Sequence, residues 1–199
     1  MSRPTGLDVL AGAPLEVAPL LLGAVVSYGD VAVRLTEVEA YDGANDPGSH
    51  AHRGPTRRNG VMFGPPGHLY CYFTYGMHVC ANVVCREEGT AGAVLLRAGE
   101  VVSGVEVARS RRPRSSDRDL ARGPARLCTA LGIGLDDDGN DLATGPITLA
   151  LSAAAPTSAI STGPRVGLRP APDWPWRFWL TDDSTVSAYR PAKPRARKA

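Results

Sequence analysis

A strand-like segment of this sequence ends in two carboxylates and an aromatic ring. It reads LTEVEAYDG, residues 35–43. Counting by twos back from Tyr41, one face carries Glu39, Glu37, Leu35, Val33 and Val31. A carboxylate beside apolar residues can act as a general base when a water is held against it. The spacing therefore predicts a pocket that contains Glu39 and Tyr41. The alternative is a glutamate at a strand end that reaches solvent or an arginine.

A second aromatic segment, LYCYFTYGM at residues 69–77, is typical of a β-hairpin with its tip near Gly76. By period two, Tyr70 and Tyr72 share one face of this hairpin. Tyr75 lies just before the turn, and an exposed aromatic ring at a tip suggests insertion into a partner. The alternative is a tyrosine that packs back onto its own hairpin.

The loop at residues 42–66 is long for a compact domain, which is typical of functional loops. The loop contains a cluster of side-chain donors, Thr56, Arg57, Arg58 and Asn59. Such donors suit binding of phosphate. The alternative is a basic loop exposed to solvent. His50 and His52 stand two residues apart without a third ligand at suitable spacing, so we expect no metal. A metal-dependent hydrolase would be excluded by full activity in EDTA.

The composition is that of an ordinary globular protein. The 199 residues are 43% hydrophobic and 21% charged, and we expect one domain over residues 1–189. We expect no membrane span and no secretory signal, which favours a cytoplasmic protein. Of 22 basic residues only Lys193 and Lys198 are lysines, and arginine suits phosphate, although a GC-rich genome would give the same bias. The four cysteines form no CxxC pair and are expected to be small buried residues.

The secondary-structure pattern predicts a mixed α/β (α+β) fold. We expect a curved antiparallel β-sheet, packed helices and a protruding β-hairpin. The expected helices are residues 8–22 and 123–132. The expected strands are 24–28, 31–41, 68–85 as a hairpin, 93–98, 147–151, and the candidates 164–168 and 176–180. Residues 190–199 are expected to form a basic, disordered tail.

Taken together, these segments resemble the alkyladenine (3-methyladenine) DNA glycosylase family of base-excision repair. The resemblance runs from about Leu15 to about Tyr189. It is carried by EAY at 39–41, DPGSHAHRGPTRRN at 46–59, MFGPPGHLYCYFTYGMHVCANVV at 62–84, VLLRA at 94–98, GPARLC at 123–128, PRVGL at 164–168, PWRF at 175–178 and VS at 186–187. These motifs follow one another in the family's order.

The resemblance implies roles for individual residues. Glu39 matches the catalytic carboxylate that activates water, and Arg97 matches an arginine that holds that carboxylate and the water. Asn82 matches the residue that crowds the exocyclic amino group of guanine, and Val166 lies where backbone groups meet the base. The matched base-stacking rings are Tyr41, His50 and Tyr72, and the matched DNA-contacting residues are Tyr75 (the wedge), Met77, Thr56, Arg58 and Asn59. Arg57 departs from the expected proline, which leaves that loop's backbone less fixed.

The resemblance implies a monofunctional hydrolase of base-excision repair. It would flip 3-methyladenine-like purines, and hypoxanthine or ethenoadenine, out of duplex DNA and cleave the N-glycosidic bond, leaving an abasic site. It implies no cofactor, a monomer, and binding of double-stranded DNA through the minor groove, in the nucleoid of a bacterial-type cell. The alternative is a catalytically silent protein that binds damaged or distorted DNA. Retention of both Glu39 and Arg97 argues against that alternative.

Overall fold

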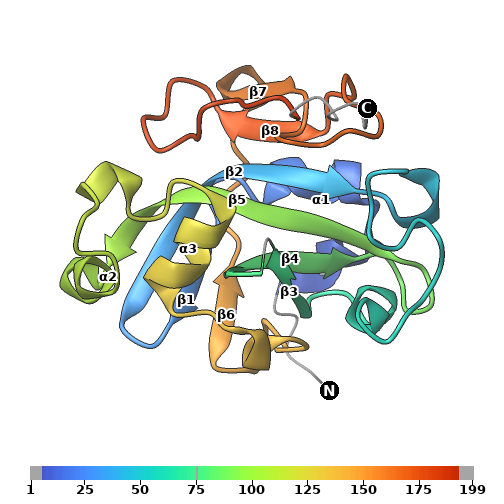
Figure 1. Ribbon diagram of the computed structural model, residues 1–199, viewed down its shortest axis with the longest axis horizontal. Helices are drawn as coiled ribbons and strands as arrows, with labels where there is room; N and C mark the ends of the chain where they lie inside the picture. The colour runs from blue at the N-terminus through green and yellow to red at the C-terminus, as the bar shows by residue number, and fades with distance from the viewer. Residues whose placement is uncertain (1–5, 75, 193–199) are drawn as a thin grey trace, which may run out of the picture.

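One antiparallel sheet runs through the whole molecule (Figure 1). The structure, a computed structural model, describes residues 6–74 and 76–192. The sheet has the order β3-β4-β5-β2-β1-β6, with β8 pairing with β2 and β7 pairing with β8. The strands are β1 (Val25–Tyr28), β2 (Val31–Tyr41), β3 (Leu69–Thr74), β4 (His78–Cys85), β5 (Gly92–Ser103), β6 (Ile147–Ala150), β7 (Ile160–Gly163) and β8 (Arg177–Leu180). The expected single-domain α+β class is confirmed.

Within residues 6–74 and 76–192, three short α-helices pack against this sheet. They are α1 (Pro14–Leu20), α2 (Val105–Arg111) and α3 (Pro124–Leu131). As expected, α3 begins with a proline at its first turn and ends at Gly132, whose φ of 86° is the left-handed conformation that glycine favours at a helix end. The first expected helix is instead split into a 3-10 turn at Leu7–Ala11 and α1. No described helix is long and apolar enough to cross a membrane.

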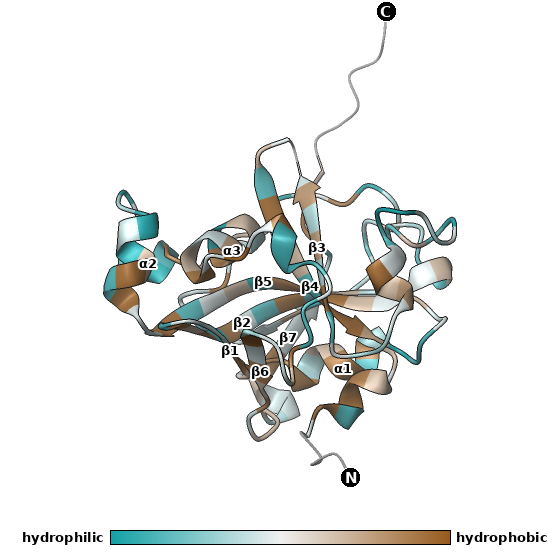
Figure 2. Cartoon of the chain, turned by 90° about the horizontal axis from the view of Figure 1, so that it is seen from below, coloured by the Kyte–Doolittle hydropathy of each residue, from teal (hydrophilic) through white to brown (hydrophobic). Residues whose placement is uncertain are grey.

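The expected hairpins are present, and two other expectations need correction. β1 pairs with β2, and β3 pairs with β4, with Thr74 and His78 as the last pair of the second hairpin. Figure 2 shows this second hairpin rising from the sheet beside α3. The candidate strand at 164–168 is wrong, since that segment is a turn, and the sequence reading missed α2 and β7. Strand β5 runs five residues beyond the expected end at Ala98.

The prediction that Val31, Val33 and Leu35 share a face of β2 with Glu37 and Glu39 is also wrong. Val31, Val33 and Leu35 lie in the hydrophobic core, but beyond them the core takes Val38 and Ala40 instead. The register of β2 against β5 shifts between Leu35 and Glu37 and again between Glu37 and Val38. These irregularities are β-bulges: the extra residue of the first is Thr36 on β2, which moves the alternation of β2 by one residue, and the extra residue of the second is Arg97 on β5. Glu37 and Glu39 therefore lie on the face opposite the core residues that precede them.

Candidate active site

A cavity of about 990 Å³ opens on the face of the sheet that carries Glu39. It lies over the middle strands, because Glu39 on β2 pairs with Leu95 on β5, which pairs with Asn82 on β4. The residues assigned to chemistry and base binding from the sequence all line it: Glu39, Tyr41, His50, Tyr72, Asn82, Arg97 and Val166. Strand pairing thus brings Glu39, Asn82 and Arg97 together, and the backbone amide of Val166, 127 positions beyond Glu39, joins them from a turn.

The Glu39 carboxylate is buried but reaches the cavity wall. Its Oε1 accepts a hydrogen bond of 2.7 Å from the Val166 amide and lies 3.4 Å from Arg97 Nε. Its Oε2 accepts a 2.9 Å hydrogen bond from the Tyr41 hydroxyl. Each carboxylate oxygen has two lone pairs, so both can still accept from a water in the cavity. These hydrogen bonds fix the orientation of the Glu39 carboxylate and leave both of its oxygens able to accept a hydrogen bond from water.

The groups around Glu39 keep their ordinary protonation states. Burial, and next the Glu39 charge, hold the pKa of the Tyr41 phenol well above its usual range, so the hydroxyl stays a donor. Burial opposes the charge on Arg97, but Glu39 and Glu37 outweigh it and raise the pKa of the guanidinium. Arg97 therefore stays cationic beside the carboxylate.

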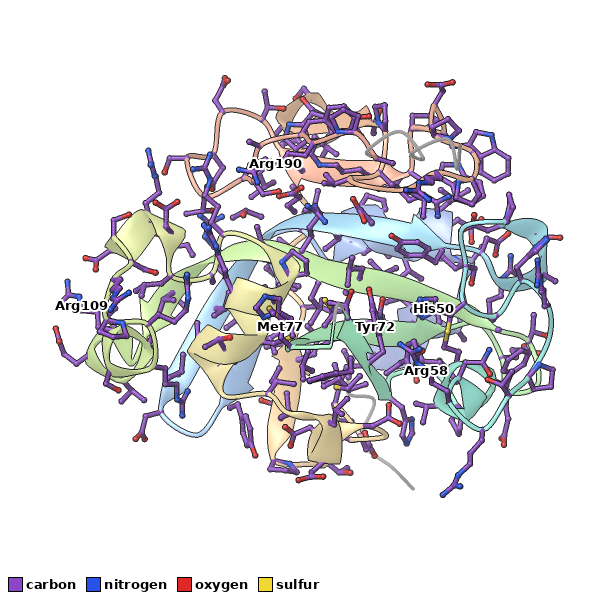
Figure 3. All side chains as sticks on the ribbon, in the orientation of Figure 1. His50, Arg58, Tyr72, Met77, Arg109 and Arg190 are labelled. Carbon is purple, nitrogen blue, oxygen red and sulfur yellow. The ribbon has the colours of Figure 1, made fainter. Side chains whose placement is uncertain are left out.

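Four aromatic side chains of the described residues line the cavity, and three of them, Tyr41, His50 and Tyr72, are the rings predicted to stack on a base. Figure 3 labels His50 and Tyr72. Those two meet edge to face, with ring centroids 4.6 Å apart, so no flat ligand fits between them. His50 Nδ1 and the Tyr70 hydroxyl lie 3.1 Å apart. Loss of hydration, followed by repulsion from Arg58, lowers the pKa of His50 below 6.5. His50 is therefore neutral at physiological pH.

The floor of the cavity carries Asn82 and Cys80 from β4. The Asn82 amide nitrogen donates to the Tyr70 carbonyl at 3.1 Å, which ties the side chain to the neighbouring strand. Burial raises the pKa of the Cys80 thiol, so it remains a neutral lining group. Cys80 is a lining residue that sequence reasoning had treated only as buried.

A buried arginine fixes the backbone that holds Glu39. Arg165, one residue before Val166, forms a bidentate ion pair with Asp46, and its NH1 also donates to the Ala40 carbonyl at 2.9 Å. Its guanidinium lies 4.6 Å from the centroid of the Tyr41 ring. Arg165 does not line the cavity, so it backs Tyr41 from the protein side. It joins the loop after β2 to the loop after β7.

The remaining predicted residues lie outside the cavity lining. Met77, at the end of the hairpin, is 68% exposed. Arg58 is exposed and donates to the Phe73 carbonyl of the hairpin at 2.9 Å. Asn59 is buried, and its side chain bonds Thr56, His50 and Gly54 within the loop. Tyr75 lies outside the described residues. A role of these residues in DNA contact stays a prediction.

The rim of the cavity includes residues that no sequence motif indicated. Arg169 and Arg190 both line it and are exposed, and neither forms an ion pair within the described part of the chain. The Gly167 amide donates to the Arg190 carbonyl at 2.9 Å, which joins their two segments. Residues 190–192, where the expected tail begins, thus contribute to the cavity wall. Residues 193–199 lie outside the described residues.

Within the described residues, no group of three His, Cys, Asp or Glu side chains is arranged to hold a metal ion. His52 is exposed, and its Nδ1 lies 2.9 Å from the Ala44 carbonyl, away from the residues that line the cavity.

Comparison with known proteins identifies the family. The model of the methylpurine-DNA glycosylase family matches residues 8–184. The chain belongs to this family. A relative from Streptomyces avermitilis is 52% identical over 98% of this chain and 96% of its own length, and one from Leifsonia xyli subsp. xyli is 55% identical over 93% and 92%. Both are named "Putative 3-methyladenine DNA glycosylase", as is a Nocardia farcinica protein that is 56% identical over 92% of this chain and 90% of its own length.

Membership in the methylpurine-DNA glycosylase family confirms the resemblance read from the motifs. The match covers every cavity-lining motif from the EAY segment to PRVGL. It ends before Ser187 and Arg190, so the last segment of the cavity wall lies beyond the matched region.

Proposed function

We propose that this chain is a monofunctional DNA N-glycosylase that removes alkylated purines, and deaminated or etheno purines, from duplex DNA. The observation that carries the proposal is the Glu39 carboxylate, held by the Val166 amide and the Tyr41 hydroxyl at the wall of a ring-lined cavity. That geometry fits a general base that orients and deprotonates a water for attack on the sugar C1′. Membership in the glycosylase family supports the same reaction.

The aromatic walls account for selection of damaged bases. An alkylated purine such as 3-methyladenine is cationic, and aromatic faces attract cations. Stacking stabilises an extruded base by about 1–3 kcal/mol per ring, whereas extrusion costs a few kcal/mol and least for a damaged base. A neutral His50 adds no repulsion against a cationic ligand. The three rings therefore offset extrusion and favour the charged lesion over normal adenine.

Rejection of guanine follows from the floor of the cavity. The Asn82 side chain is fixed by its hydrogen bond to Tyr70, so it cannot move aside at low cost. We propose that it obstructs the exocyclic amino group that guanine carries and adenine lacks. Specificity then rests on a repulsive contact as well as on stacking.

Release of the base by water, rather than by a protein amine, is part of the proposal. The described cavity lining includes no lysine that could form a Schiff base with the sugar. A cationic base is already a good leaving group, so the reaction needs only an activated water. The product is an intact DNA strand with an abasic site.

We further propose that the enzyme acts as a monomer on chromosomal DNA in the cytoplasm, from the minor-groove side. The β3–β4 hairpin, with exposed Met77 and Phe73 near its end, has the form of a wedge. Apolar side chains that enter the minor groove unstack a base step and stabilise a distorted duplex. Arg58 lies beside the hairpin, where it can meet the backbone.

The test compares the parental protein with Glu39→Gln on a duplex that contains ethenoadenine or 3-methyladenine, with alkali used to cut abasic sites. General-base catalysis contributes about 10²- to 10⁴-fold, so the variant should release base at least about 100-fold more slowly and still bind the lesion duplex. Glu100→Gln is the matched control, because Glu100 pairs with Arg34 on the surface. Equal rates for Glu39→Gln and the parental protein would refute the role of Glu39. Binding without base release by the parental protein would indicate a silent binder.

A further inference from the structure

The second carboxylate of β2, Glu37, is a buried hub that the proposed reaction does not use directly. It is fully buried and does not line the cavity. Its Oε1 accepts from Arg97 Nε at 2.8 Å and from Arg177 Nε at 2.6 Å. Its Oε2 accepts from the Ser187 amide at 2.7 Å, and the Ser187 hydroxyl lies 3.0 Å from Oε1. Four donors from three segments therefore converge on one side chain.

Arg97 is shared between Glu37 and Glu39, and the sharing is unequal. Its Nε lies 2.8 Å from Glu37 Oε1 but 3.4 Å from Glu39 Oε1. A charge-assisted N–H···O bond is normally about 2.7–2.9 Å long, so only the contact with Glu37 is a full hydrogen bond. The Arg97 side chain is 9% exposed and borders the cavity. Glu37 thus determines the position of the Arg97 guanidinium relative to the Glu39 carboxylate.

The sheet irregularities make this sharing possible. Glu37 pairs with Ala98 and Val38 pairs with Leu96, which leaves Arg97 as the extra residue of a bulge. A bulge re-aims a side chain and commonly lies beside an active site. Here it places Arg97 on the same face as the two glutamates.

The charges in this group balance. Glu37 and Glu39 supply two negative charges, and Arg97 and Arg177 supply two positive charges, all within buried side chains. Removal of the Glu37 charge would leave Glu39 as the one carboxylate within reach of Arg97 among the described contacts. Because unpaired buried charges are costly, Arg97 would then close on Glu39.

We propose, resting on the glycosylase function proposed above, that Glu37 is a positioning residue that holds Arg97 back from Glu39. The Glu39 Oε1 lone pair that faces Arg97 stays available to the attacking water. Through Ser187 the same carboxylate anchors the segment that leads to Arg190 and the cavity rim. The Glu37 side chain thus positions Arg97 relative to the Glu39 carboxylate and also anchors the segment that forms one wall of the cavity.

The experiment compares Glu37→Gln with the matched control Glu100→Gln on an ethenoadenine duplex. The single-turnover rate of base release and the Kd for a duplex with a non-hydrolysable lesion nucleotide are measured separately. We expect Glu37→Gln to slow release at least about tenfold, with a Kd within about threefold of the parental value, because the stacking rings are untouched and the glutamine oxygen can still accept from the Ser187 amide. The control should match the parental protein in both. A purely structural role would weaken binding and rate together.

A second variant addresses folding. Glu37→Gln leaves two buried arginines against one carboxylate, whereas Glu37→Gln/Arg177→Gln removes one charge of each sign. We expect the double variant to be more stable in thermal unfolding and still slow. A parental rate in either variant would overturn the proposal, as would failure of both to fold, because Glu37 would then act in folding alone. An inactive parental protein would instead refute the proposed function.

Discussion

Replacement of Arg165 by methionine tests the buried ion pair that braces the site. Arg165 and Asp46 are both almost fully buried, and the pair is bidentate. Removing one partner of a buried pair strands the other charge and costs about 3–5 kcal/mol. For a chain of 150–250 residues each kcal/mol shifts Tm by about 2–4 °C, so Arg165→Met should lower Tm by about 6–20 °C. Methionine retains the bulk of the side chain, so a cavity contributes little to this loss.

The assay is thermal unfolding followed by circular dichroism, with a double-mutant cycle. Arg165→Met/Asp46→Asn carries no stranded charge, because both new side chains are neutral. Asparagine also keeps an acceptor for the Gly48 amide, which donates to Asp46 at 2.8 Å. The double variant should therefore be more stable than Arg165→Met alone. A Tm for Arg165→Met within about 2 °C of the parental protein would refute the reasoning. So would a double variant that is less stable than the single one.

Two further predictions concern the cavity and its rim. Because loss of hydration, and next Arg58, lower the pKa of His50 below 6.5, the ring is neutral above that value and becomes cationic only at lower pH. As the pH falls through this lowered pKa, the rate ratio for cationic 3-methyladenine over neutral ethenoadenine should therefore fall, and His50→Phe should abolish the change. A pH-independent ratio in the parental protein would contradict this. Arg169→Ala and Arg190→Ala should each weaken binding to damaged and undamaged duplex alike and reduce the slope of log K against log salt by about 1, as measured by titration at several salt concentrations. An unchanged slope would show that neither arginine meets a phosphate.

Local patterns in the sequence predicted the elements that depend on neighbouring residues. The turn after Tyr28, the helix opened by Pro124 and the alternation of Tyr70 and Tyr72 all follow from short-range propensity and period, and the structure contains them. The cavity-lining residues were found by family motifs. Period two placed Tyr41 and Glu39 on one face correctly, because no bulge lies between them.

Long-range contacts were not predictable in the same way. The segment at 164–168 resembles a strand in composition, yet it is a turn, because Arg165 is drawn to Asp46 and the Val166 amide to Glu39. Nothing local to that segment encodes partners more than 100 residues away. The sequence did not predict the cluster of hydrogen bonds at Glu37 for the same reason: its donors come from β5, β8 and Ser187. Its one sequence signal was its position two residues before Glu39 on the same strand.

The bulge in β2 explains how one strand contributes to both the hydrophobic core and the cavity. With strict alternation, Glu37 and Glu39 would follow Leu35 into the hydrophobic core, where a charge has no water and few partners. The bulge at Thr36 shifts the pattern of β2, so Val38 and Ala40 fill the core and the glutamates face Arg97. The irregular sheet therefore places the charges where arginines balance them. A regular strand could supply either the core residues or the carboxylate proposed as the general base, and the bulged strand supplies both.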